Sequence, residues 1–226
     1  MVINPKVQIG LALILFVAYC VLPDAFSRLQ LLYGYASRYP LIYPLLINGL
    51  FSCFFIWLLP FKHIDYGLRF AGFEWKKILL ITFCIQVFPF TIFLLLLNVN
   101  DLYLSSWMVL SLFEIVTIYL VLSPLVEELF FRGLIQTFLS PLLNFNLSIK
   151  NLIISVPVLI TTILFTVIHF TYSVISMIFI FSLGLLCGYL REKHKSLAPA
   201  IFAHFVFNLF AVFVPKLILM YTESKY

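Results

Sequence analysis

Long apolar stretches separated by short polar breaks constrain this chain more than any other feature. Seven stretches can be read along the 226 residues, at 7–23, 40–60, 78–99, 107–140, 151–172, 174–190 and 197–220. Because a helix of about 20 apolar residues crosses the hydrocarbon core of a bilayer, there is room for roughly seven or eight transmembrane helices. The sequence therefore predicts an all-α, polytopic integral membrane helical bundle, in which residues 1–226 form a single membrane domain.

The composition excludes several other classes of protein. Hydrophobic residues make up 64% of the chain and charged residues only 10%, against about 25% charged residues in an average soluble domain. The net charge of +5 is scattered over the polar breaks, so we interpret the basic residues as topology signals and expect no nucleic-acid partner. The cysteines have no paired spacing, which indicates packing residues; they are Cys20, Cys53, Cys84 and Cys187.

The distribution of basic residues predicts an orientation in the membrane. The first stretch lacks a small-residue cleavage site, so we interpret it as a retained span. With the N-terminus inside and seven spans, ten of the 14 Lys and Arg residues fall on the inner side and four on the outer side. Because cytoplasmic loops hold the excess of Lys and Arg, we expect a cytoplasmic N-terminus and an outside C-terminus. The compactness of the chain favours a bacterial plasma membrane.

Two carboxylates and a guanidinium interrupt the apolar stretch at 107–140. Glu128 and Arg132 are four residues apart, so on a helix they lie on one face and can form an ion pair. Glu127 points about 100° away and lacks that partner. A charged side chain at the centre of a bilayer costs about 2.5–3.5 kcal/mol, which makes the cluster a candidate functional site. We expect one structural and one chemical carboxylate; an ion-paired helix end at the membrane surface is the alternative.

Two later apolar stretches supply further polar groups. His169 ends the run that begins at Phe165, and His204 lies one helical turn before Asn208, on the same face. Each could be a hydrogen-bonded packing residue on its own. Together with Glu127, however, they offer from three helices the kinds of group that handle a water molecule, which favours a catalytic site.

Hydrolysis by activated water is the chemistry that these residues can perform, because the chain has no phosphate-binding loop, GxSxG or HExxH motif. In one route a desolvated Glu, helped by an imidazole, takes a proton from water, while a second imidazole and an amide stabilise the oxyanion. In the other, Glu127, His169 and His204 hold a Zn ion that leaves its fourth position open for the water. The sequence does not separate the two routes.

Several short blocks between residues 105 and 210 carry a resemblance to a known family. The blocks are Glu127-Glu128-x-x-Phe131-Arg132-Gly133, Phe165-x-x-x-His169, Gly184-x-x-x-Gly188-Tyr189, Ser196-Leu-x-Pro-Ala and His204-x-x-x-Asn208. In order and spacing they are similar to the CPBP family of intramembrane proteases. That family includes the type II CAAX prenyl endopeptidases and bacterial proteins labelled Abi or bacteriocin self-immunity. The resemblance covers a catalytic core at 105–210, and the first hundred residues match only as generic spans.

The resemblance implies roles for the polar residues. Glu127 and His169 would activate the water, while His204 and Asn208 would bind the oxyanion. Glu128 and Arg132 would support the site. The family has been described both as glutamate-type and as metal-dependent, so Zn remains an open cofactor.

We therefore expect an intramembrane endopeptidase that cleaves a peptide or a membrane-anchored protein close to the cytoplasmic side of the bilayer. A proton-coupled transporter would also need buried Glu, His and Arg side chains, but it predicts repeat symmetry that this chain lacks. A non-catalytic membrane scaffold or immunity protein that has kept the motifs is the other alternative.

The catalytic interpretation makes one demand on the helix ends. With simple spans starting at Trp107 and Asn151, Glu127 would lie about 30 Å from one face of the membrane and His169 about 27 Å from the other, so the two would not meet. We therefore predict that the fourth helix continues past Glu127 towards Ser140. We also predict that the fifth helix enters the hydrocarbon near Pro157, a residue suited to a first helical turn.

Overall fold

The computed structural model describes residues 5–28, 42–58, 65–68, 73–96, 110–143, 145–149 and 152–223. Parts of the expected polar breaks at 24–39, 60–77, 100–106 and 144–150 lie outside these residues, as does Trp107. The helices and strands are α1 (Pro5–Ser27), α3 (Ile42–Leu58), α4 (Trp75–Thr82), α5 (Phe88–Leu96), α7 (Leu112–Ile115), α8 (Ser123–Glu128), α9 (Thr137–Leu139), β1 (Asn146–Ile149), β2 (Leu152–Ser155), α10 (Val156–Val167), α11 (Val174–His194), α12 (Ala198–Asn208) and α13 (Val214–Glu223). Four π-helical segments continue these helices, at Phe83–Val87, Val116–Leu122, Leu129–Gln136 and Leu209–Phe213.

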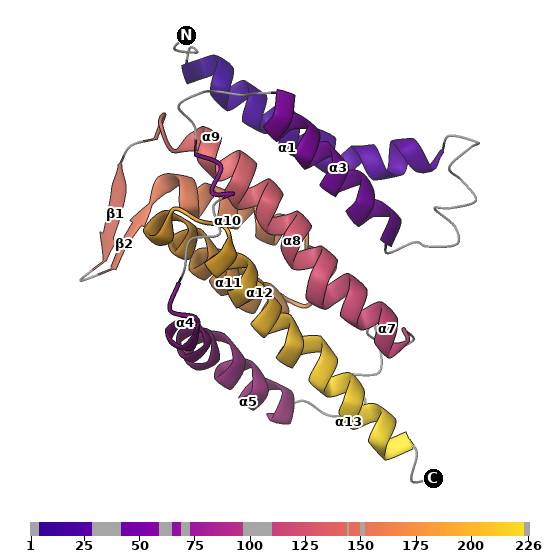
Figure 1. Ribbon diagram of the computed structural model, residues 1–226. Coiled ribbons are helices and arrows are strands. Elements are labelled where there is room, and N and C mark those ends of the chain that lie inside the picture. Colours follow the sequence, from indigo (N-terminus) through magenta and orange to yellow (C-terminus); the bar gives the residue numbers. More distant parts are fainter. Residues whose placement is uncertain are drawn as a thin grey trace.

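One long helix at 112–139, which we call the central helix, consists of α7, α8, α9 and the π-helical segments between them. It begins with a capping box, in which the Ser111 side chain accepts from the Glu114 backbone and the Glu114 carboxylate accepts from the Ser111 backbone. Helices α1 and α3 pack on one side of it, and α10, α11 and α12 pack on the other (Figure 1). The prediction that this helix continues past Glu127 is confirmed.

The core of the bundle is built largely from the central helix. Phe130, Phe131 and Phe138 are fully buried against α1, α3 and α10. The ring of Tyr19 from α1 stacks on Phe130 with centroids 3.9 Å apart. Because aromatic rings have large apolar areas, this packing fixes the rotation of the central helix and therefore the direction in which its polar face points.

Four helices are long and apolar enough to cross a membrane among the residues that the structure describes: Val7–Ser27, Trp75–Ile92, Val174–His194 and Ala198–Leu217. This shows an integral membrane protein, but it does not confirm the expected count of about seven spans. The central helix has the length but carries four charged residues. Helix α10 has 12 residues and extends about 18 Å, less than the roughly 30 Å of a hydrocarbon core.

The described residues are mostly helical, as predicted, and one small β-hairpin was not expected. Strands β1 and β2 pair antiparallel, with Asn146 opposite Ser155, and they project from the end of the bundle where the central helix stops (Figure 1). The apolar residues after 151 thus begin as a strand, and α10 starts only at Val156. The Ser155 hydroxyl caps α10 by accepting from the Val158 backbone, and Pro157 lies in the first turn. The prediction that the fifth helix begins near Pro157 is confirmed.

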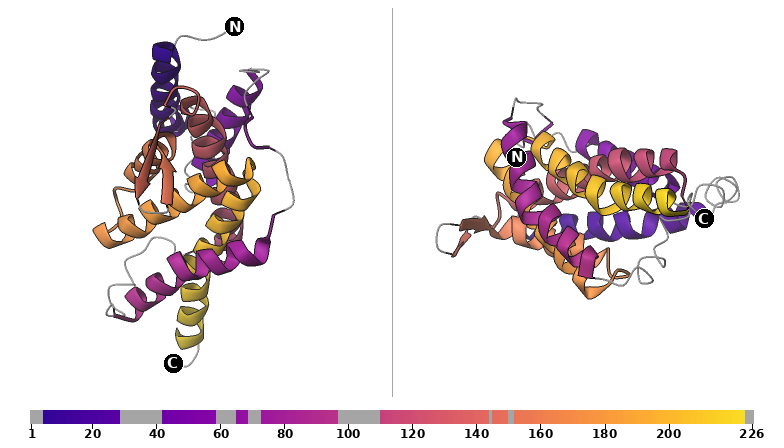
Figure 2. Two further views of the ribbon diagram at one scale, coloured as in Figure 1. Left: turned by 90° about the vertical axis from the view of Figure 1, so that its left-hand side faces the viewer. Right: turned by 90° about the horizontal axis from the view of Figure 1, so that it is seen from below.

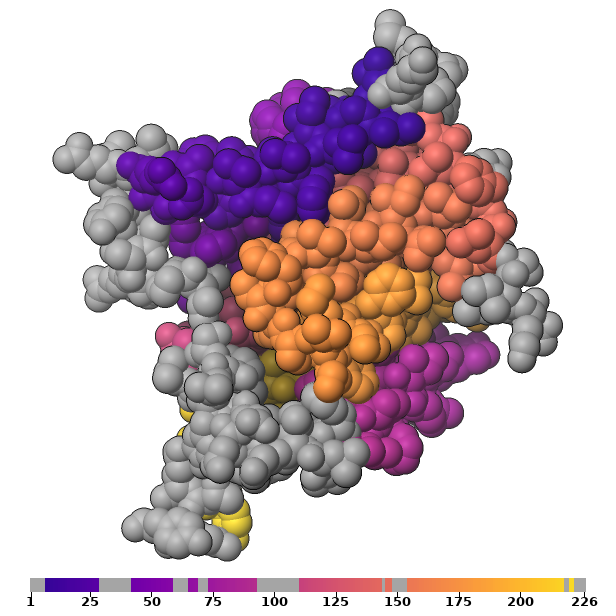
Figure 3. Space-filling view, turned by 180° about the vertical axis from the view of Figure 1, so that it is seen from behind, coloured from indigo at the N-terminus to yellow at the C-terminus, as the bar shows by residue number. Residues whose placement is uncertain are grey.

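Helices α10, α11 and α12 follow one another in the chain, and α11 packs against both of the others (Figure 2). Seen from behind, α10 and the start of α11 lie between α1 and the α4–α5 helix (Figure 3). Two glycines permit the close contact of α11 with α10. A Cβ atom at Gly184 would lie 2.9 Å from Thr162 Cγ2, and one at Gly188 would lie 2.7 Å from Val158 Cγ1. The Gly184-x-x-x-Gly188 spacing therefore sets how closely α11 approaches the site.

Candidate active site

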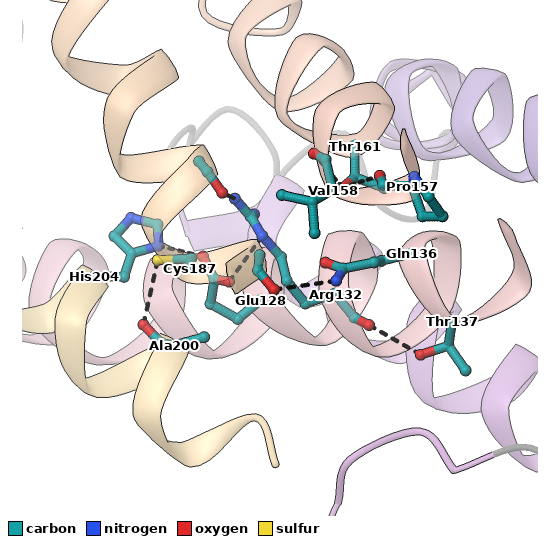
Figure 4. A network of polar contacts seen from close by, with 12 residues as sticks. Glu128, Arg132, Gln136, Thr137, Pro157, Val158, Thr161, Cys187, Ala200 and His204 are labelled. Carbon is teal, nitrogen blue, oxygen red and sulfur yellow. Dashed lines mark hydrogen bonds and ion pairs between the residues drawn. The ribbon is translucent and has the colours of Figure 1, made fainter. Parts of the chain in front are cut away.

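The buried polar centre is built around Glu128 (Figure 4). Its Oε2 atom lies 3.2 Å from Arg132 Nε within the central helix, and its Oε1 atom lies 2.9 Å from His204 Nδ1 of α12. The Glu128 and Arg132 side chains are 0% exposed. Both oxygens of this carboxylate therefore have cationic or hydrogen-bonding partners, which is what a buried charge requires. The predicted Glu128–Arg132 pair is confirmed.

A row of polar side chains continues along the same face of the central helix. Arg132 Nη2 donates to the Gly184 carbonyl at 3.1 Å, and Gln136 Nε2 donates to the Gly188 carbonyl, also at 3.1 Å. The donors Arg132 and Gln136 are four residues apart, and so are the acceptors Gly184 and Gly188. One turn of the central helix therefore contacts one turn of α11. The absence of glycine side chains leaves these carbonyls accessible to donors from another helix.

Glu127 has different surroundings from its neighbour. Its Oε1 atom accepts a hydrogen bond from the Ser123 hydroxyl at 2.5 Å, one turn earlier. Its Oε2 atom has no hydrogen-bond partner within the described part of the chain, although the residue is only 8% exposed. The phenol groups of Tyr119 and Tyr172 lie within electrostatic reach of this carboxylate. One carboxylate is thus fully paired and the adjacent one is half paired.

His169 lies just outside the helix on which the sequence analysis placed it. Helix α10 ends at Val167, and His169 belongs to the following turn, where its backbone N–H donates to the Thr166 carbonyl. Its Nδ1 atom lies 2.7 Å from the Phe165 carbonyl oxygen. Because a carbonyl can only accept, Nδ1 carries a proton, so in the neutral ring the lone pair is on Nε2.

His204 and Asn208 lie on one face of α12, as their spacing predicts, but they contact different parts of the central helix. His204 is bonded to Glu128, whereas Asn208 Nδ2 donates to the Tyr119 carbonyl at 2.8 Å. Asn208 is 8% exposed and His204 is 3% exposed. These bonds hold α12 against the central helix and fix the orientation of both side chains.

The ring of Phe165 lies between the cationic and imidazole groups of the site. The Arg132 guanidinium carbon lies 4.5 Å from the ring centroid, a cation–π contact. The ring centroids of His169 and His204 lie 4.9 Å and 5.8 Å from it. Phe165 is therefore a common neighbour of both histidines, which links α10 and its following turn to α12.

The residues proposed as zinc ligands do not fit that role in this arrangement. Glu127, His169 and His204 all lie in the described part of the chain, and no group of three or more His, Cys, Asp or Glu side chains gathers there in a way that could hold a metal ion. We therefore assign no step of the chemistry to a metal.

Several residues of the site were not identified from the sequence. Ser123 and Gln136 stand four residues before Glu127 and four after Arg132, and this spacing is the signal that could have found them. The carbonyls of Gly184 and Gly188 have no sequence signal as acceptors, because which donors reach them depends on how the helices pack. Cys187, between these glycines, donates its thiol to the Ala200 carbonyl at 3.5 Å, and this contact likewise depends on packing.

Fold and site together define a helical membrane protein with a buried carboxylate, guanidinium and imidazole centre. Residues 108–210 match the family described as type II CAAX prenyl endopeptidase Rce1-like. The match includes every block on which the resemblance depends, and it confirms the similarity to the CPBP family of intramembrane proteases. It supports, in general terms, a CAAX-type intramembrane endopeptidase with a peptide or protein substrate in the membrane. Comparisons with curated proteins and with solved structures gave no significant match.

Proposed function

We propose that the chain hydrolyses a peptide bond of a membrane-anchored protein or peptide, with a water molecule activated by Glu127 and His169. The observation that carries this proposal is the contrast between the two adjacent carboxylates. Each oxygen of Glu128 lies within ion-pair distance of Arg132 or His204. In the described residues, Oε2 of Glu127 has neither an ion pair nor a hydrogen bond. A carboxylate with an open oxygen in a largely buried site is suited to accept a proton from water.

Ser123 and the Phe165 carbonyl support the same assignment. The Ser123 hydroxyl holds Oε1 of Glu127, which leaves Oε2 to face a water molecule. The Phe165 carbonyl holds Nδ1 of His169, so that Nε2 is a second acceptor for a proton. In the proposed step, water loses a proton to Glu127 or His169 as its oxygen attacks the carbonyl carbon of the scissile bond. That proton then passes to the leaving amine.

His204 and Asn208 are proposed to stabilise the oxyanion of the tetrahedral intermediate. The Glu128 carboxylate accepts from His204 Nδ1, so a protonated His204 would donate to the substrate oxygen through Nε2. Asn208 uses one amide hydrogen for the Tyr119 carbonyl and keeps a second for the substrate. Donors held in place before the reaction are the usual source of oxyanion stabilisation. Arg132 acts indirectly, because it positions Glu128.

The orientation of the chain is part of the proposal. The described segment 65–68, the hairpin and the link between α11 and α12 meet at one end of the bundle, where the Leu197 backbone donates to the Gly67 carbonyl. This end carries Arg191, Lys193 and Lys195. We infer that it faces the cytoplasm of a bacterial cell, with the N-terminus inside and the C-terminus outside.

Cleavage of a quenched peptide library by the detergent-purified chain tests the proposal. Glu127→Gln keeps the shape of the side chain but removes its basicity, so we expect the rate to fall by about 10²–10⁴-fold. His169→Ala and His204→Ala should show losses of similar size. Glu114→Gln, on the same helix but in its capping box, is the matched control and should cleave at the rate of the wild type.

The outcomes separate this proposal from its rivals. Cleavage by Glu127→Gln at the rate of the wild type would overturn the assignment of the base. Inhibition by a zinc chelator, reversed by zinc, would transfer the activation of water to a metal. Proton-coupled uptake of a solute by vesicles that contain the chain, without cleavage, would indicate a transporter. A cellular phenotype that survives Glu127→Ala would indicate a scaffold or immunity protein.

A further inference from the structure

A polar cavity lies at the end of the bundle, outside the candidate active site. It has a volume of about 680 Å³. Its lining comes from the end of the central helix, the hairpin, the start of α10, the end of α11 and the segment 65–68. It is built from the ends of helices and the links between them, and in the orientation proposed above this end of the bundle lies at the headgroups of the bilayer.

The cavity is separate from the catalytic groups. None of Glu127, His169, His204 and Asn208 lines it. Gln136, which does line it, is eight residues from Glu128, or about 12 Å along the central helix. Arg132 lies between the two and is 0% exposed, so a layer of packed side chains divides the cavity from the site.

Two buried polar atoms in the lining lack partners among the described residues. They are Gln136 Oε1, which can only accept a hydrogen bond, and Arg191 Nε, which can only donate one. The residues are 2% and 6% exposed. Gln136 Nε2 donates to the Gly188 carbonyl, and Arg191 Nη2 donates to the Asp65 carbonyl. Both unpartnered atoms have less than 1 Å² of accessible surface, so they lie beneath the cavity wall, and the accessible charges of the lining decide which ligand the cavity can hold.

The charges of the lining narrow the class of ligand. Arg191 and Lys195 are cationic, and Asp65 and Glu192 are anionic. A simple anion would meet two carboxylates, and a simple cation would meet two cations. A ligand with both charges matches the lining, with its anionic group at Arg191 and Lys195 and its cationic group at the carboxylates. If the cationic group is a primary ammonium, it can also donate hydrogen bonds to the two carboxylates.

We propose that this cavity binds a phosphoethanolamine group, with the phosphate at Arg191 and Lys195 and the ammonium at Asp65 and Glu192. The group is present in a phospholipid headgroup and in a soluble small molecule. A phosphocholine group is a poorer match, because its quaternary ammonium cannot donate a hydrogen bond to the carboxylates. The proposal concerns binding at the membrane surface and does not depend on proteolysis.

Thermal unfolding of the delipidated full-length chain in detergent tests the proposal. Four probes are titrated: short-chain phosphatidylethanolamine, phosphatidylcholine and phosphatidylglycerol, and free phosphoethanolamine. We expect the phosphatidylethanolamine to raise the unfolding temperature with at least about tenfold higher affinity than the other two lipids. Free phosphoethanolamine that binds as tightly as the lipid would support the site but assign it to the soluble compound. Equal affinity for all three lipids would overturn the proposal.

Two mild variants and a control link the effect to the cavity. Lys195 has a backbone φ of 51°, a conformation that asparagine tolerates, so Lys195→Asn removes the charge without strain. It should weaken the binding of phosphatidylethanolamine by about tenfold or more. Asp65→Asn, which keeps an acceptor for the Gly67 backbone, should reduce the preference over phosphatidylcholine. Lys193→Gln, an exposed cation of α11 outside the lining, should bind like the wild type. Wild-type affinity in Lys195→Asn and Asp65→Asn would overturn the proposal.

Discussion

Arg132→Met removes the guanidinium from the buried pair with Glu128 and leaves a side chain of similar length in its place. Neither partner is exposed, and the pair is 3.2 Å apart. Removing one partner of such a pair leaves an uncompensated charge in the interior. We therefore expect the free energy of unfolding to fall by about 3–5 kcal/mol.

The double variant Glu128→Gln/Arg132→Met separates the charge from the packing. It removes both charges of the pair, so we expect it to be less destabilised than Arg132→Met alone. The assay is reversible unfolding in mixed micelles by increasing mole fractions of sodium dodecyl sulfate, followed by circular dichroism. Lys77→Gln is the control, because it breaks an exposed pair with Glu74 at 3.7 Å and should cost less than about 1 kcal/mol.

Two results would refute this reasoning. Arg132→Met could unfold within about 1 kcal/mol of the wild type, a change expected for an exposed pair and not for a buried one. Alternatively, the free energy of unfolding of the double variant could fall by the sum of the losses in Glu128→Gln and Arg132→Met, which would show that the two residues act independently. Either result would mean that Glu128 does not depend on Arg132 for its charge balance.

Three further predictions address packing and catalysis. Gly188→Ala should lower the free energy of unfolding by about 1–3 kcal/mol in the same assay, because the added Cβ would lie 2.7 Å from Val158 Cγ1. The second substitution Val158→Ala should recover part of this loss. No recovery would contradict the contact. Ser123→Ala should lower the rate of peptide cleavage by about tenfold or more, because Glu127 loses its hydrogen bond, with little change in the free energy of unfolding. An unchanged rate would argue against a role of Ser123 in holding Glu127. A membrane-permeant maleimide should label the buried Cys187 only after denaturation, as read by mass spectrometry of the peptide that contains it. Labelling of Cys187 in the folded chain would contradict its burial.

The apolar pattern predicted the positions of the helices well, because long uninterrupted apolar runs have few alternatives to a helix in a membrane. It failed at the hairpin. Leu152, Ile153 and Ile154 are as apolar as the helix that follows, so hydropathy alone does not distinguish a short strand from the first turn of a span. The polar residue that ends the strand, Ser155, is the cap of α10 and could have signalled the boundary.

The polar site was predictable where its contacts are local. The spacing of Glu128 and Arg132 within one helix predicted their pairing. The partner of Glu128 on α12 and the acceptors of Arg132 and Gln136 on α11 were not predictable, because they depend on which faces of separate helices meet. The end of α10 before His169 was also missed, since no glycine or proline marks it.

The polar row on the central helix has a consequence for how the chain enters the membrane. Glu128 and Arg132 belong to the same helix, so their charges can neutralise each other as soon as that segment is helical. The acceptors Gly184 and Gly188 and then His204 arrive later in the order of synthesis. Insertion from the N-terminus onwards can therefore proceed with the Glu128–Arg132 pair already formed, and the later helices supply its remaining partners.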